Sequence, residues 1–193
     1  MAERLIKKDI ADPSGSILVK VNLRSPEIRC ASAKDPLKRH AVPFYVSLSD
    51  TLASYAEGDL FKAASKRSGT EGFIPFAAVM NWEMTCNSDN YISFVTDISI
   101  SDGRSGDRER RTQIWDRKTG QRCVFYDFFL PGSAGKMASK VMPGNEKRFD
   151  RELFVLRENG YEFFKRNGKG TFEGVFFTKE ELADEGLLRD MNL

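Results

Sequence analysis

The sequence predicts an α+β fold, in which an antiparallel β-sheet packs against one long helix and is followed by a short C-terminal helix. Three observations predict it. Apolar residues alternate with period two in several segments, one stretch near the N-terminus has helical spacing, and turn-forming residues separate successive strands. A chain of 193 residues suits one domain. We therefore expect a single domain over 1–193, with a strand pair and helix in 1–70 and the main sheet and last helix in 71–193.

The first two strands are expected at Leu5–Ile10 and Ile17–Arg24, because apolar and polar residues alternate along the second of them. The turn Asp12–Gly15 contains proline and glycine and joins the two strands. Two prolines in Ser25–Pro36 predict a loop.

A long helix is expected over about Leu37–Lys66, where apolar residues recur at helical spacing. Ser49 is a candidate N-cap within this stretch, and Ser68 and Gly69 are a candidate stop signal. Gly58 is expected to interrupt the stretch, which gives either one kinked helix or two short ones.

The middle of the chain predicts four consecutive antiparallel strands. Two turn-rich segments, Asn87–Asn90 and Asp116–Gly120, connect them as hairpins. The expected strands are Ala77–Cys86, Tyr91–Ser101, Arg111–Trp115 and Arg122–Tyr126.

The C-terminal third begins with a segment rich in glycine and proline, Leu130–Asn145, in which only Lys136–Val141 has a helical pattern. Further strands are expected at Leu153–Arg157, Tyr161–Arg166 and Gly174–Phe177, the first two around an Asn-Gly turn. Thr178 and Glu181 have the spacing of a capping box and predict the start of the last helix.

The composition limits where the protein acts and what it binds. With 30 basic and 28 acidic residues the formal net charge is +2, which gives no general attraction for nucleic acid, so nucleic acid is not the expected partner. The longest apolar run, Phe73–Trp82, is about half the length that spans a membrane, so we expect no membrane insertion. As written, the chain is expected in the cytoplasm. An exported parent trimmed of its signal would have the same sequence.

The residues needed for common catalytic and metal sites are scarce. His40 is the one histidine and lies in no metal or triad motif, and nothing local supports a dyad of His40 with Cys123. The three cysteines, Cys30, Cys86 and Cys123, contain no CxxC pair and are expected as free thiols. We therefore expect no enzyme activity, no cofactor and no metal. Glu83 and Asp97 could face each other across the central hairpin, although a solvated sheet face is the simpler interpretation. A hydrolase whose carboxylates act without histidine is an alternative function.

Two basic clusters are the candidate binding residues, because arginine and lysine on loops can bind phosphates or acidic partners. Asp102–Arg111 holds four arginines against three acids, and Lys136–Arg151 holds five basic residues against two acids. A nucleic-acid-binding protein that uses these clusters is a second alternative. The candidates are Arg104, Arg108, Arg110, Arg111, Lys136, Lys140, Lys147 and Arg148.

Aromatic residues gather in two stretches, around Phe125–Phe129 and from Tyr161 to Phe177. Their spacing suits core strands, and no RNP-like motif accompanies them. We therefore expect most of these rings in the core.

A family resemblance covers the layout of most of the chain. Its first part is Phe94–Phe129, with a small-residue loop at Gly103–Gly106, a D-x-K-T-G element at Asp116–Gly120, and a strand that runs into "DFF". Its second part is "LFVLRENGYEFFKRNGKGTFEGVFFTKEEL". These motifs resemble the domain of RsiV-type lysozyme-sensing anti-sigma factors, which also accompanies PdaC-type polysaccharide deacetylases. In that family the loop carries a G-G-A-H element, where this chain has Gly103-Arg104-Ser105-Gly106.

The resemblance implies a non-catalytic binding module. It implies a protein partner such as a lysozyme, or a cell-wall-related ligand. The two basic clusters are then the surfaces expected to make the contact, because loops on a rigid sheet commonly carry recognition.

Overall fold

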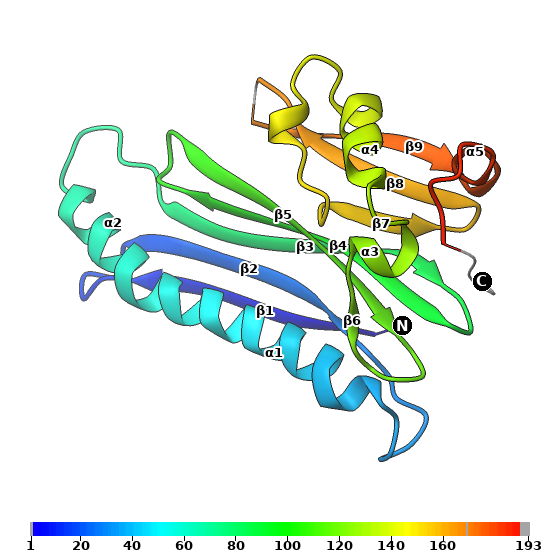
Figure 1. Cartoon of the computed structure of the whole chain (residues 1–193). Helices are drawn as coiled ribbons and strands as arrows, with labels where there is room; N and C mark the ends of the chain where they lie inside the picture. The colour runs from blue at the N-terminus through cyan, green and yellow to red at the C-terminus, as the bar shows by residue number, and fades with distance from the viewer. Residues whose placement is uncertain (1, 169, 190–193) are drawn as a thin grey trace. The chain divides into compact units, whose positions relative to one another are not determined.

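The computed structural model describes residues 2–168 and 170–189 (Figure 1). These residues form two compact units, one of 2–82 with 96–109 and the other of 83–95 with 110–189. Each unit combines strands and helices, so the α+β class is confirmed. The single-domain organisation stays a prediction.

Two sheets hold the nine strands of the described residues. The first has the order β1-β2-β3-β4-β5-β6 and the second the order β7-β8-β9. The strands are β1 (Ala2–Ala11), β2 (Ile17–Glu27), β3 (Phe76–Asn87), β4 (Tyr91–Ser101), β5 (Gly106–Asp116), β6 (Arg122–Cys123), β7 (Phe154–Arg157), β8 (Gly160–Arg166) and β9 (Phe172–Thr178).

The helices account for most of the remaining regular structure. A continuous helical run comprises α1, the π-helical turn η1 and α2, and shorter helices lie in the C-terminal half. Their bounds are α1 (Leu37–Tyr55), η1 (Ala56–Leu60), α2 (Phe61–Arg67), α3 (Phe125–Phe128), α4 (Ser133–Val141), the 3₁₀ turn η2 (Glu146–Arg148) and α5 (Lys179–Asp184). Among the described helices, none is long and apolar enough to cross a membrane.

The first sheet is mixed, whereas the sequence predicts an antiparallel one. Strands β1 and β2 are antiparallel, but β2 and β3 run parallel, with Val19 opposite Phe76 and Leu23 opposite Met80. The helical run connects β2 to β3, and a helical crossover is the usual way to join parallel neighbours. The other pairs with a defined register, β5–β6, β7–β8 and β8–β9, are antiparallel as expected.

The long helix begins earlier than Ser49, and the N-cap prediction is wrong. The first residue is Leu37, whose N–H donates to Asp35 Oδ1 over 3.0 Å. Ser49 is buried inside α1, where its Oγ donates to the Tyr45 carbonyl and accepts from Arg4 Nη1 over 2.7 Å. Its hydroxyl therefore anchors β1 to the helix and caps nothing.

Gly58 marks a change in helical winding without ending the helix. It lies in η1, so the run is continuous through the position where an interruption is expected. The run ends at Arg67, and Ser68 is the C-cap, as the stop signal predicts. Apolar residues of the helix, including Leu48, Leu60 and Ala64, pack on β2 and β3, and Figure 1 shows the helix lying along β1 and β2.

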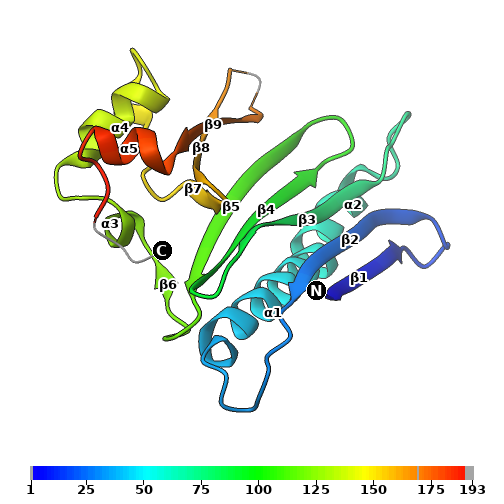
Figure 2. The same cartoon turned by 90° about the vertical axis from the view of Figure 1, so that its right-hand side faces the viewer.

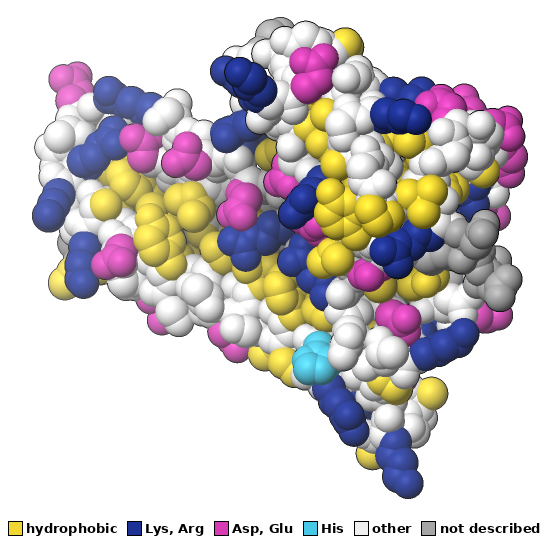
Figure 3. All heavy atoms as spheres, viewed as in Figure 1, with side chains coloured by type: hydrophobic (Ala, Val, Ile, Leu, Met, Phe, Trp, Pro, Cys, Tyr) yellow, Lys and Arg dark blue, Asp and Glu magenta, His cyan; other side chains and the backbone are white. Residues whose placement is uncertain are grey.

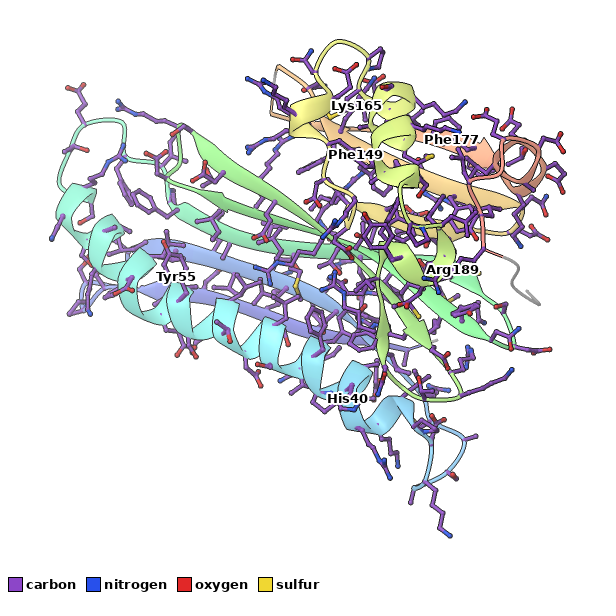
Figure 4. All side chains as sticks on the ribbon, viewed as in Figure 1. His40, Tyr55, Phe149, Lys165, Phe177 and Arg189 are labelled. Carbon is purple, nitrogen blue, oxygen red and sulfur yellow. The ribbon has the colours of Figure 1, made fainter. Side chains whose placement is uncertain are left out.

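The second unit is built around a phenylalanine cluster. The Phe125 and Phe129 rings stack at 4.4 Å between centroids, and Phe154 and Phe163 stack at 5.2 Å. Phe149 and Phe177, labelled in Figure 4, pack against Phe163 at 5.8 and 6.2 Å. Helices α4 and α5 lie on one side of β7-β8-β9 (Figure 2). Most of the aromatic residues are thus in the core, but one exception, Phe176, is 48% exposed.

The strand expected at Arg122–Tyr126 is wrong beyond Cys123. Strand β6 has only two residues, and the chain then forms one turn of helix, α3. The Asp127 carboxylate accepts from the Val124 N–H over 2.7 Å, which stabilises this turn. The turn buries both Phe125 and Phe128 fully. A continued strand would place these two residues, three positions apart, on opposite faces of the sheet.

The capping box that opens α5 is confirmed. Thr178 Oγ1 accepts from the Glu181 N–H over 3.1 Å, and the Glu181 carboxylate accepts from the Thr178 N–H over 2.8 Å. The helix is six residues long, so its start depends on these two bonds.

Replacing Thr178 tests this cap. Thr178→Ala removes the hydroxyl acceptor and is expected to lower the free energy of unfolding by about 1 kcal/mol. Thr51→Ala, at an exposed position inside α1, is the control and should change stability by less than about 0.5 kcal/mol. Urea denaturation measures both, and equal effects of the two substitutions would contradict the role of the cap.

Candidate functional site

The candidate site in the first unit is the turn between β4 and β5, residues Asp102–Ser105, here called the Asp102 loop. The Asp102 N–H donates to the Ser105 carbonyl over 2.9 Å and closes the turn. Asp102 Oδ1 accepts from the backbone N–H groups of Arg104 and Ser105 over 3.0 and 2.8 Å. The loop is therefore shorter than the expected Asp102–Arg111, because β5 already begins at Gly106.

An arginine at the end of the long helix binds the second oxygen of the Asp102 carboxylate. Arg67 Nη1 donates to Asp102 Oδ2 over 2.7 Å, and the Arg67 guanidinium also lies 5.3 Å from the centre of the Phe76 ring. The Ser105 N–H, the Arg67 guanidinium and the Arg104 N–H hold the pKa of Asp102 well below its usual range. The carboxylate is therefore ionised at neutral pH and organises the loop.

Gly103 fits the loop closely against a neighbouring segment. Its φ of +87° is in the left-handed region, and a Cβ there would lie 2.5 Å from the Ile74 carbonyl oxygen. The Ile74 side chain is 53% exposed. The loop thus presents an exposed aliphatic side chain beside its own backbone.

Two of the predicted binding residues lie at this site with exposed side chains. Arg104 is in the Asp102 loop and Arg108 is on β5. Among the described residues, neither guanidinium has a hydrogen-bond or ion-pair partner. An exposed guanidinium group, whether on the turn as in Arg104 or on the following strand as in Arg108, can bind carboxylate or phosphate oxygens through two parallel hydrogen bonds.

Arg110 and Arg111, predicted with them, have structural contacts instead. Arg110 belongs to the second unit, where its guanidinium lies 4.5 Å from the Phe164 ring centre and 5.3 Å from that of Phe172. Arg111 is half-buried and also makes contacts within the fold. The ring contacts of Arg110 connect β5 to Phe164 of β8 and Phe172 of β9.

The second predicted cluster is divided in the same way. Lys140, on α4, forms an ion pair with Glu185 at 2.5 Å and lies 5.8 Å from the Phe177 ring centre. Lys136 on α4 and Lys147 and Arg148 in η2 are exposed. The helix expected at Lys136–Val141 is present, so this cluster is a helix and a 3₁₀ turn rather than one loop.

The histidine and the three cysteines, which are the side chains most often used in catalysis and metal binding, lie outside the Asp102 loop. His40 is exposed on α1 and is the cyan side chain of Figure 3. All three cysteines are free, as expected, and burial raises the pKa of the Cys123 thiol to about 12. In residues 2–168 and 170–189, no group of three His, Cys, Asp or Glu side chains could hold a metal ion.

Glu83, one of the two acids expected to face each other across the central hairpin, is held by an arginine. Glu83 and Glu162 both accept hydrogen bonds from the Arg157 guanidinium. Partial burial lowers the pKa of Arg157, but these two bonds outweigh it and raise the pKa above its ordinary value. Glu83 therefore takes part in an ion-pair network that joins β3 to β7.

Sequence reasoning did not identify Arg67 and Ile74 as parts of the site. Arg67 lies 35 residues from Asp102, and no local pattern connects them. The Asp-Gly-Arg-Ser sequence does predict a turn in which aspartate accepts backbone hydrogen bonds, which was the available signal for the loop.

Substituting Gly103 tests the fit against Ile74. Gly103→Ala introduces both a left-handed residue and a Cβ clash, and should lower the free energy of unfolding by about 2–4 kcal/mol. Gly15→Ala is the matched control, because Gly15 has the same φ of +87° with no heavy atom near its Cβ. The control should cost about 1 kcal/mol. Equal losses in chemical denaturation would show that the Ile74 contact is unimportant.

The charge on Asp102 gives a pH-dependent prediction. Because the folded pKa is depressed, its stabilising contribution is complete above the unfolded value of about 3.9 and is lost as pH falls toward the folded pKa. Asp102→Asn should therefore lower Tm at neutral pH, and the difference from wild type should shrink as pH falls below about 4. Asp107→Asn, at an exposed position on β5, is the control. A Tm difference independent of pH would contradict the assignment.

The comparisons with known proteins concern the fold. No family model matches the sequence, and no curated protein matches it. The chain is similar to the crystal structure of a DUF3298 family member from Bacteroides fragilis, with a TM-score of 0.68 and 11% identity over 98% of this chain and 94% of that one. It is also similar to a DUF3298 family protein from Pseudomonas aeruginosa, with a TM-score of 0.56 and 12% identity over the same shares. This chain therefore has the fold seen in DUF3298 family structures.

Proposed function

We propose that the chain is a non-catalytic binding module that recognises a protein, and that the Asp102 loop makes the contact. The observation that carries the proposal is the prearranged loop itself. Asp102, Arg67 and Gly103 hold the loop backbone that carries Arg104, so this backbone has little conformational freedom left to lose on binding. Arginine is enriched at protein interfaces and among the residues that contribute most to binding energy, and the exposed Ile74 adds apolar surface beside it.

A lysozyme is the partner to test first, because the chain resembles RsiV-type lysozyme-sensing domains. Lysozymes of the c type cleave their substrate with two carboxyl groups in an open cleft. A projecting turn with a guanidinium group has the charge to pair with such carboxylates. A cell-wall-related ligand with carboxylate or phosphate groups would use the same arginines.

The charge pattern argues for a local contact and against an extended polyanion. On the face shown in Figure 3, basic and acidic side chains alternate without a large area of one sign. Nucleic-acid binding generally needs several clustered cations and weakens steeply with salt. The binding assay below is therefore done at two salt concentrations.

Calorimetric titration with a c-type lysozyme tests the proposal. We expect saturable binding at low salt and at about 150 mM salt. Arg104→Glu and Arg108→Glu should each weaken it by at least about tenfold, because a charge reversal at an interface arginine costs more than its removal. Arg39→Glu is the matched control. Arg39 is exposed on α1, roughly 40 Å along the helical run from Arg67, and its reversal should leave Kd unchanged.

The outcomes separate the parts of the proposal. Binding that is unaffected by both reversals would place the contact elsewhere and overturn the role of the Asp102 loop. Absence of binding would remove lysozyme as the partner, and the same variants would then be compared in an unbiased capture of binding proteins. Binding that disappears at the higher salt, and that all three charge reversals weaken equally at low salt, would indicate non-specific charge attraction and overturn the proposal.

A further inference from the structure

A separate hollow lies in the second unit, between the β3–β4 hairpin and the β7–β8 turn. Its volume is about 210 Å³, and its lining includes Cys86, Ser88, Asp89, Tyr91, Glu158 and Lys179. A neighbouring hollow of about 330 Å³ shares Cys86, Ser88 and Glu158 with it. The first of them, whose lining holds the charged residues, is called the Cys86 depression below. All of these residues belong to the second unit, so the Asp102 loop plays no part in it.

The charged side chains of this depression are not neutralised by one another. Within the described part of the chain, Asp89, Glu158 and Lys179 have no side-chain hydrogen bond or ion pair. Arg157 also lines the hollow, but Glu83 and Glu162 already occupy its guanidinium. The charges left to bind a ligand are two carboxylates and one ammonium group.

The remaining lining is small and partly apolar. Leu156 is buried, and the Tyr91 ring packs against Phe128 at 5.3 Å between centroids. Ser88 is held in place because its Oγ accepts from the Tyr91 N–H over 3.1 Å. A volume of 210 Å³ is below the range of about 300–1,000 Å³ typical of sites for drug-sized ligands, so the occupant must be smaller.

We propose that this depression binds a small zwitterion of amino-acid or dipeptide size. Its ammonium group would lie at Asp89 and Glu158, and its carboxylate at Lys179. A ligand with only one of these charges pairs with the carboxylates or with the ammonium group but not with both, and it therefore gains less electrostatic attraction and binds more weakly. The proposal is independent of the proposed function, because it uses other residues in the other unit.

Cys86 is a built-in reporter for the occupant. It is half-buried and lines both hollows, so a bound molecule should shield its thiol from alkylation. Cys30, half-buried in the first unit, reports non-specific effects of the added ligand. Cys123 is buried and should stay unmodified as long as the protein is folded.

The experiment measures iodoacetamide alkylation of each cysteine by peptide mass spectrometry, with alanylalanine as the zwitterion. With a Kd of about 1 mM, about 10 mM dipeptide should slow alkylation of Cys86 about tenfold and leave Cys30 unchanged. N-acetylalanine and alaninamide carry one charge each and should protect weakly. Lys179→Ala should abolish protection by the dipeptide, whereas Lys118→Ala, at an exposed turn of the same unit, should retain it.

Three results would overturn the proposal. The first is no protection of Cys86 by the dipeptide. The second is equal protection by the dipeptide and by either singly charged analogue. The third is full protection in the Lys179→Ala variant while Cys123 stays unmodified. A loss of lysozyme binding in the Arg104→Glu variant would leave all three measurements unchanged.

Discussion

The apolar face of β2 has to be covered, and the helical run Leu37–Arg67 covers it. Full burial of one large aliphatic side chain contributes about 1.5–3 kcal/mol, whereas an exposed ion pair contributes about 0–1 kcal/mol. The packing of residues such as Leu48 and Leu60 on the sheet therefore sets the position of the helix. Its last residue, Arg67, then lies where it can bind Asp102. The conformation of the Asp102 loop thus depends on the hydrophobic packing of a helix that lies far from the loop in the sequence.

In the second unit the corresponding constraint is the phenylalanine cluster. It joins the single helical turn α3 to β7 and β8 through Phe125, Phe154 and Phe163. Basic residues of this unit pack on aromatic rings, because the apolar stems of arginine and lysine contact the rings and their charges are attracted to the ring faces. Arg110 and Lys140 are examples. This is why charge clusters in the sequence overestimate the number of cations that a partner can reach.

The two proposed sites differ in shape and in the size of partner that they suit. At the Asp102 loop the backbone is ordered and the cation is displayed, which suits a large partner with its own charged surface. In the Cys86 depression, charged side chains without partners in the described residues line a hollow of about 210 Å³, which suits a small molecule. The similarity to DUF3298 family structures establishes the architecture on which both sites lie.

Local patterns in the sequence determined most of the strands, the extent of the long helix and the capping box at Thr178, because alternation, helical spacing and caps depend on near neighbours. Only the tertiary structure decided that β2 and β3 are parallel, that Ser49 lies inside a helix, and that α3 replaces a strand. The same holds for the site. The turn at Asp102 is encoded locally, but its contact with Arg67 and the packing of Arg110 on the Phe164 ring join residues far apart in the chain. Such contacts depend on how the helices and strands pack together, and local sequence patterns carry no information about that packing.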